Sequence, residues 1–284
     1  MHSGRQTVRI LFVLRKIRLN WRTLSWLVVL LGAVTIVLPL GLVVVGSLQP
    51  GGLVTGLAPG RWNLANYRAA WAGANFPLAF ALTTLVALAV TALQIVTSAL
   101  AGYALARLDF RGRQGVLLLV LATIVIPYQV LVVPIFLVLR TGGLVNSFWA
   151  LVLPTAANGY GIYLLRQFFL GVPRALEEAA FIDGANRLQV LWEVLLPLSR
   201  PALVTLGLFT FIAEWNDLFK PLVFAPAGNL LTVQLALSRF QERFATDFSV
   251  LMAATVISSL PVVALFLLGQ RQLVRGIATT GLKN

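Results

Sequence analysis

Charge is scarce in this sequence. Only 11% of its 284 residues are charged, while 59% are hydrophobic, whereas a soluble domain carries roughly 25% charged residues. The chain therefore lacks the charge to cover a water-facing surface, and we expect lipid to be its main solvent. Cysteine is absent, so disulfides and thiolate metal sites are excluded. The single histidine, His2, lies beside the terminus, where an incidental role is expected.

Six apolar stretches are long enough to cross a bilayer, which requires roughly 20 mostly apolar residues. The first is too long for the roughly 7–15-residue apolar region of a signal peptide, so we expect a retained span. The sequence thus predicts an all-α, polytopic membrane protein with six transmembrane helices. The predicted spans are about Leu24–Leu48, Leu78–Leu105, Val116–Leu139, Phe148–Phe169, Ala202–Phe224 and Val250–Leu268.

Proline falls inside or at the edges of the third and fourth spans, at Pro127, Pro134 and Pro154. A proline in a membrane helix frees a carbonyl, which neighbouring helices or a water-lined cavity must satisfy. These residues favour kinked helices around a translocation path, or kinks that serve packing alone.

Basic residues sort to one side of the predicted spans. The net charge is +13, and 16 of the 22 Lys and Arg residues fall in the N-terminal segment, the loops after spans two and four, and the C-terminal tail. Because basic residues favour the cytoplasmic side, both termini are predicted to be cytoplasmic, as an even number of spans also requires. Nucleic-acid binding would need clustered basic residues on a soluble face, so no nucleic-acid partner is expected.

The spans divide the chain into four segments. Residues 1–23 form a basic cytoplasmic segment, and residues 24–77 hold the first span and an extracytoplasmic loop. Residues 78–270 form a five-helix core with a cytoplasmic loop at 171–200, and residues 271–284 form a cytoplasmic tail.

The loop after span four has the most informative pattern, GVPRALEEAAFIDGANRLQVLWEVLLPLSRPAL. Pro173 suits a first helical position, and Gly184 is the natural stop of a short helix. A second apolar stripe follows at helical spacing, formed by Leu188, Leu191, Trp192 and Leu195. Two short helices joined by a tight turn are predicted. They could dock into a groove on a soluble partner, or form an ordinary interfacial loop with solvated charges.

This loop resembles the EAA loop of ABC importer permeases, whose pattern is Glu-Ala-Ala, three residues, Gly, nine residues, then Ile-x-Leu-Pro. The sequence has EAA at 178–180, then Gly184 and VLLP at 194–197, so Val replaces only the Ile. The resemblance implies a coupling helix held in a cleft of an ATPase subunit, with Glu178 paired to a basic residue there and Gly184 making the turn. The implied coupling residues are Glu177, Glu178, Ala179, Ala180, Asp183, Gly184 and Pro197.

Three further motifs resemble the carbohydrate-uptake branch of these permeases: AGYALARLDFRGR at 101–113, WND at 215–217 and GIATTGLKN at 276–284. The resemblance is to the smaller permease of maltose-type and glycerol-phosphate-type importers. It implies a type I ABC importer permease fold in a bacterial inner membrane. The implied partners are a second permease subunit in a heterodimer, two ATP-hydrolysing subunits, an extracytoplasmic solute-binding protein and membrane lipid.

The same resemblance implies two contact regions. The C-terminal tail would touch the ATPases through Thr279, Thr280, Gly281 and Lys283. The outer loop around Gly228–Asp247 would touch the binding protein, with candidate residues Gln234, Arg239, Glu242 and Arg243.

Apart from Arg166 near the cytoplasmic end of span four, the charged residues inside the spans are Glu214, Asp217 and Lys220, all in span five. Intramembrane charges are costly and usually functional, and a spacing of three places these residues on neighbouring turns. They could line the translocation path, or fix the helix end at the interface. The candidate path residues are Tyr128, Gln129, Asn158, Tyr160, Glu214, Trp215, Asn216 and Asp217.

No G-x-x-x-x-G-K-[ST] motif is present, so ATP must be hydrolysed on partner subunits. We predict a passive pathway subunit, without cofactor or enzymatic activity, of an importer for an oligosaccharide, a disaccharide or a polyol glycoside. The same architecture importing glycerol phosphate is one alternative. A proton-coupled secondary transporter using Asp217 or Glu214 is another, although no internal repeat of the kind common in that class is evident.

Overall fold

The computed structural model describes residues 21–49, 62–73, 75–243 and 247–281, and these ranges contain helices and turns but no strand. The all-α prediction is confirmed. In chain order the elements are α2 (Trp21–Ser47), α3 (Ala65–Gly73), α4 (Phe76–Arg107), α5 (Arg113–Val125), α6 (Tyr128–Thr141), α7 (Phe148–Val152), the 3₁₀ turn η2 (Leu153–Thr155), α8 (Gly159–Gly171), α9 (Arg174–Ile182), α10 (Arg187–Gln189), the π-helical segment η3 (Val190–Leu195), α11 (Leu196–Leu198), α12 (Arg200–Trp215), α13 (Phe219–Phe224), α14 (Val233–Arg243) and α15 (Phe248–Gly281).

Three helices of the described chain are long and apolar enough to cross a membrane on their own: α2, α4 and the part of α15 up to Gln270. Three further pairs reach that length only together, because a sharp bend divides each. The bends are 105° between α5 and α6, 45° between α7–η2 and α8, and 81° between the segment Arg187–Leu198 and α12. The described residues therefore provide three to six candidate spans, and the predicted six is the upper count.

Proline accounts for two of the breaks. Pro127 stands immediately before α6 with extended backbone, φ −61° and ψ 131°, and Ile126 before it is also extended, as the steric demand of a following proline favours. Pro154 lies in the 3₁₀ turn η2. Pro134, in contrast, lies inside α6, so only two of the three prolines mark a break.

Span five was predicted to be continuous, and the structure corrects this. Helix α12 ends at Trp215, and α13 begins at Phe219. The Oδ1 atom of Asp217 accepts hydrogen bonds from the backbone N–H groups of Phe219 at 2.9 Å and Lys220 at 3.3 Å. These side-chain hydrogen bonds offer the backbone N–H groups an alternative to the bonds of a continuous helix. The chain then begins the separate helix α13.

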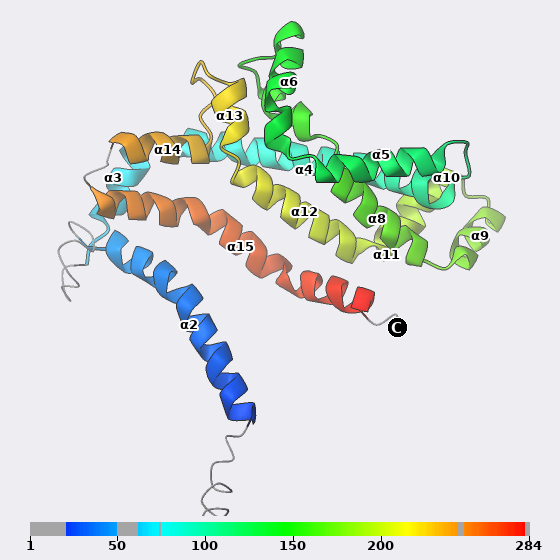
Figure 1. Ribbon diagram of the computed structural model, residues 1–284, viewed down its shortest axis with the longest axis horizontal. Helices are drawn as coiled ribbons and strands as arrows, with labels where there is room; N and C mark the ends of the chain where they lie inside the picture. Colours follow the sequence, from blue (N-terminus) through cyan, green and yellow to red (C-terminus); the bar gives the residue numbers. More distant parts are fainter. Residues whose placement is uncertain (1–20, 50–61, 74, 244–246, 282–284) are drawn as a thin grey trace, which may run out of the picture.

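Helix α4 is the central packing element of the fold. Its 32 residues extend about 48 Å at a rise of 1.5 Å per residue. It packs along α8 and α12, while α15 packs against α12, α2 and α3. The approach of α4 to α8 depends on small residues: a Cβ at Gly102 would lie 3.1 Å from the backbone nitrogen of Arg166, and such positions let membrane helices pack closely. In Figure 1, α9 and α10 lie at one end of the molecule and α3 and α14 at the other.

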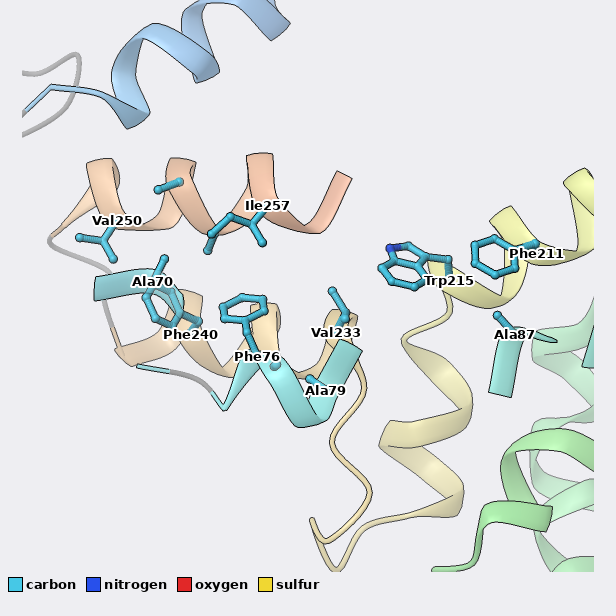
Figure 2. Close-up of a cluster of buried hydrophobic side chains, with 13 residues drawn as sticks. Ala70, Phe76, Ala79, Ala87, Phe211, Trp215, Val233, Phe240, Val250 and Ile257 are labelled. Atoms are coloured by element: carbon cyan, nitrogen blue, oxygen red, sulfur yellow. The ribbon is translucent and has the colours of Figure 1, made fainter. Parts of the chain in front are cut away.

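A cluster of buried hydrophobic side chains lies at each of these two ends. The cluster near α14 contains four aromatic residues, and Figure 2 shows Phe76 and Phe240 near Ala70 of α3, with Trp215 beside Phe211. Near α9, the cluster is mostly aliphatic and joins α4, α8, η3, α11 and α12, with Leu191 and Leu195 fully buried. The second cluster therefore fixes the latter half of the loop between α8 and α12 to the spanning helices.

Candidate functional site

The first half of the loop between α8 and α12 is the short helix α9, whose end follows from the sequence. Gly184 has φ +87°, a left-handed conformation that only glycine adopts without strain. The N–H of Ala185 donates to the carbonyl of Ala180 at 2.9 Å, and the N–H of Gly184 donates to that of Phe181 at 3.1 Å. These two bonds form a Schellman motif, so the predicted stop at Gly184 is confirmed.

The second half begins with a capping box. The side chain of Asn186 accepts from the N–H of Gln189 at 3.0 Å, and the side chain of Gln189 accepts from the N–H of Asn186 at 2.8 Å. The chain then continues through the π-helical segment η3, whose wider turn changes which residues share a face. Only part of the predicted apolar stripe is covered: Leu191 and Leu195 are buried, whereas Leu188 and Trp192 are 58% and 51% exposed.

The two adjacent glutamates of α9 point in different directions. The side chain of Glu177 is buried and its Oε1 lies 2.5 Å from Nε of Arg107, the last residue of α4. The two atoms are not aligned as a hydrogen bond, so the contact is an ion pair. Burial raises the pKa of the Glu177 carboxyl, and the charge of Arg107 opposes that rise. Glu178 is exposed to the surroundings of the loop.

Large apolar side chains on the loop are also exposed. Ile182 is 86% exposed, and Leu176 and Phe181 are 45% and 43% exposed. Exposed apolar groups gathered on one short helix are typical of a surface that another protein covers. We call Glu178, Phe181 and Ile182, which lie on one side of the helix, the docking face of α9. Of the other predicted coupling residues, Ala179, Asp183 and Pro197 are exposed and Ala180 is half-buried.

A second polar site lies at the break between α12 and α13. Lys220 and Glu214 form a buried ion pair, and Nζ of Lys220 also lies 3.4 Å from Oδ2 of Asp217. The same Nζ donates to the hydroxyl of Thr155 in η2 at 2.9 Å. Lys220 thus joins the break in span five to the break in span four.

This polar cluster is closed in the structure. The cavity beside it has a volume of about 10 Å³ and is lined by residues that include Thr83, Thr232 and the three charged groups. That volume holds about one water molecule. A sugar would require the cavity to open.

Three of the other predicted path residues, Trp215, Asn158 and Asn216, form their hydrogen bonds outside this cluster. Trp215 is 1% exposed and donates from Nε1 to the carbonyl of Ser258 at 2.9 Å, which places it in the aromatic cluster of Figure 2. Asn158 caps α8 by accepting from the N–H of Tyr160 at 2.7 Å. The side chain of Asn216 accepts from Gln234 of α14 at 3.1 Å.

Tyr128 opens α6 and is half-buried, while Gln129 beside it is exposed. The phenol of Tyr128 lies within electrostatic range of Asp217 and Glu214. Both Tyr128 and Gln129 follow the 105° bend.

The predicted partner-contact regions are only partly described. Gln234 and the exposed Arg239 lie on α14. Glu242 and Arg243 belong to the last turn of that helix, and Thr279, Thr280 and Gly281 to the end of α15, but their side chains lie outside the described set. Lys283 lies outside the described residues altogether.

Sequence reasoning missed two functional candidates. In the sequence, Arg107 stands out only as part of the motif AGYALARLDFRGR. No spacing rule connects it with Glu177, which lies 70 positions later. Asn186 could have been found, because Asn followed by Gln at the third position has the form of a capping box.

Comparison with known proteins gives a consistent result. The family described as "Binding-protein-dependent transport system inner membrane component" matches residues 95–279. The chain is 36% identical over 227 residues to the "Probable ABC transporter permease protein YurM" of Bacillus subtilis (strain 168), covering 79% of this chain and 75% of that one. It is 36% identical over 222 residues to the "Sulfoquinovosyl glycerol transport system permease protein SmoH" of Agrobacterium fabrum (strain C58 / ATCC 33970), covering 78% of each.

Among solved structures, the fold matches a chain of a bacterial ABC transporter involved in the import of the acidic polysaccharide alginate. The TM-score is 0.79 at 25% sequence identity, and the match covers 89% of this chain and 96% of the other.

Proposed function

Because the chain belongs to the family of binding-protein-dependent transport system inner membrane components, we propose that it forms one half of the translocation path of an ATP-driven sugar importer. Membership establishes an ABC transporter permease of the carbohydrate-uptake type, which is not itself an enzyme because separate subunits hydrolyse ATP. The proposal adds the route of energy coupling, the partners and the kind of sugar.

The docking face of α9 carries the proposal. Glu178, the first residue of the EAA motif, and Ile182 both point outward from this face. Gly184, which has the spacing from Glu178 that the motif requires, ends the helix. An exposed carboxylate beside apolar side chains suits a cleft that supplies a basic residue and an apolar wall. We therefore assign this face to an ATPase subunit, whose movement on ATP binding would be passed to the spanning helices.

The two ends of the molecule would serve different partners. The docking face of α9 lies at the opposite end from α14 (Figure 1), so an ATPase at the first and a solute-binding protein near Gln234 and Arg239 would lie on opposite sides of the membrane. Both termini would then be cytoplasmic. A second permease would complete the path as a heterodimer, and two ATPases would drive it.

For the substrate we propose an oligosaccharide, a disaccharide or a polyol glycoside. The transporter named for sulfoquinovosyl glycerol, a glycoside of a polyol, supports that class. Glycerol phosphate is less well supported, because Lys220, the cation in span five, is already paired with Glu214 and Asp217. Asp217 and Glu214 would reach sugar hydroxyls only when the closed cavity opens.

The test is to purify the tagged subunit from detergent-solubilised native membranes and identify the proteins that accompany it. A P-loop ATPase and a second permease are expected. A lone protein without an ATPase would contradict the proposal and favour a proton-coupled transporter, with Asp217 as the residue to replace.

Two substitutions test the coupling role in cells. We expect Glu178→Lys, which reverses the charge, and Gly184→Pro, which removes the left-handed turn, to abolish sugar uptake while the subunit stays in the membrane. Glu193→Lys, an exposed charge reversal on the same loop but outside the docking face, is the matched control and should preserve uptake. Normal uptake by both test variants would refute the coupling role of this loop.

A further inference from the structure

The inner side of α9 carries a contact that docking does not explain. Glu177 and Arg107 have side chains only 8% and 6% exposed, with Oε1 and Nε 2.5 Å apart. Nη2 of Arg107 also donates to the carbonyl of Val172, which follows α8, at 2.6 Å. One guanidinium therefore joins the end of α4, the end of α8 and the coupling helix α9.

The rest of α9 is weakly attached to the spanning helices. Its large apolar residues, Leu176, Phe181 and Ile182, are exposed, and its packing is mainly against the short segment η3. The Glu177–Arg107 ion pair is therefore a direct contact between α9 and a helix crossing the membrane. Because both groups are buried, each depends on the other for charge compensation.

The end of α4 is itself held firmly. Nε and Nη2 of Arg113 in α5 donate to the carbonyls of Leu105 and Ala106 at 3.0 and 3.1 Å. Nε of Arg166 in α8 donates to the carbonyl of Leu105 at 3.2 Å. These are carbonyls that a helix end leaves without internal partners. A displacement of Arg107 would therefore carry α5 and α8 together with α4.

We propose that Glu177 is a positioning residue for energy coupling: its ion pair with Arg107 makes α9 and α4 move as one body. Glu178 faces the ATPase, and Glu177 passes the movement inward. The inference rests on the proposed ATPase docking at α9, and it assigns the neighbouring glutamates opposite tasks. The 32 residues of α4 then carry the displacement along the length of the bundle.

The first experiment uses the complete importer, with its ATPases, second permease and binding protein, reconstituted in liposomes. Glu177→Gln preserves the shape of the side chain and removes its charge. We expect the ATPases still to co-purify and to hydrolyse ATP, while the sugar taken up per ATP falls by at least roughly tenfold. Glu178→Gln is the matched control, and its defect should be reduced ATPase co-purification.

The exchanged pair Arg107→Glu with Glu177→Arg should recover much of the lost coupling, whereas either reversal alone should not. Loss of ATPase co-purification from Glu177→Gln would overturn the proposal, because it would make Glu177 a direct contact. An unchanged ratio of sugar to ATP would overturn it as well. A wild-type complex that contains no ATPase would instead refute the proposed function itself.

A second experiment uses the absence of cysteine from the chain. In the variant Arg107→Cys with Glu177→Cys, no uncompensated charge remains, and a short bifunctional thiol reagent can replace the ion pair by a covalent bridge. We expect poor coupling before bridging and recovered coupling afterwards. Normal coupling before bridging, or failure of the bridge to restore it, would show that α9 and α4 need not move together.

Discussion

The two halves of the loop between α8 and α12 are attached to the molecule in opposite ways. Helix α9 turns its apolar residues outward and is tied inward by the ion pair of Glu177 with Arg107. The segment η3 turns Leu191 and Leu195 inward, where both are fully buried among residues of α4, α8 and α12. Aliphatic packing within the subunit holds η3 in place. The exposed apolar residues of α9, in contrast, become buried only when another surface covers them.

This difference predicts that identical truncations will have different consequences in the two halves. In η3 they should lower the stability of the subunit, and in α9 they should lower its affinity for the ATPase. The four predictions below test this difference, from the largest expected effect on the free energy of unfolding to the smallest.

The largest effect is expected in η3. Leu195→Ala removes a fully buried side chain from the aliphatic cluster, and such truncations cost about 2–5 kcal/mol. Thermal unfolding of the purified subunit in detergent should show a clear loss of Tm. Leu188→Ala, on an exposed residue of the same loop, should leave the Tm nearly unchanged, and equal losses for both variants would contradict the assigned burial.

A smaller effect is expected at the junction of the halves. Gly184→Ala places a side chain where φ is +87° but where a Cβ would meet nothing within 4 Å. The cost is therefore conformational, about 1–2 kcal/mol. Gly171→Ala, also in open space and without a positive φ, is the control and should not be destabilising. Equal Tm values for the two variants would argue against the left-handed turn.

The capping box should contribute less again. Asn186→Ala removes the acceptor of the Gln189 N–H, and the loss of such a cap costs about 1 kcal/mol. Hydrogen exchange of the α10 amides should become faster, while exchange in α9 stays the same. Asn186→Asp preserves an acceptor and should restore protection; protection unchanged in Asn186→Ala would exclude the cap.

The smallest effect on stability is expected at the most exposed apolar residue. Ile182→Ala, at a side chain 86% exposed, should change the free energy of unfolding by less than about 0.5 kcal/mol. Its ATPase affinity should nevertheless fall by roughly tenfold, since burying such a side chain is worth about 1.5–3 kcal/mol. Titration of the ATPase onto immobilised complex measures this. A large loss of Tm with unchanged affinity for the ATPase would contradict the predicted difference between α9 and η3.

Helix ends in the loop could be predicted from sequence because they depend on local chemistry. Gly184 stops α9 through its own backbone freedom, and the signal is visible without a neighbour. The direction of each glutamate could not be predicted, because Glu177 and Glu178 differ by only one position on a nine-residue helix. Which of them is buried depends on where α9 meets Arg107, a residue from a distant part of the chain.

Two further differences have local causes that the hydropathy pattern conceals. The spacing at 188–195 predicts a helix with 3.6 residues per turn, whereas η3 within it is a π-helical segment with a wider turn. Span five reads as one apolar run, but Asp217 caps a new helix at Phe219 and ends the first one. In both cases the sequence predicted a helix correctly, while a change of backbone geometry within it went unseen.

The outward apolar residues of α9 also affect how the subunit must be produced. Until a partner covers Ile182 and Phe181, both lie exposed at one end of the molecule, and uncovered apolar surface promotes aggregation. If an ATPase covers this face, as proposed, the cell must supply one ATPase for each copy of this chain that is inserted. Surplus copies would keep this face uncovered. Chaperones and proteases that bind exposed hydrophobic segments would recognise those copies by it.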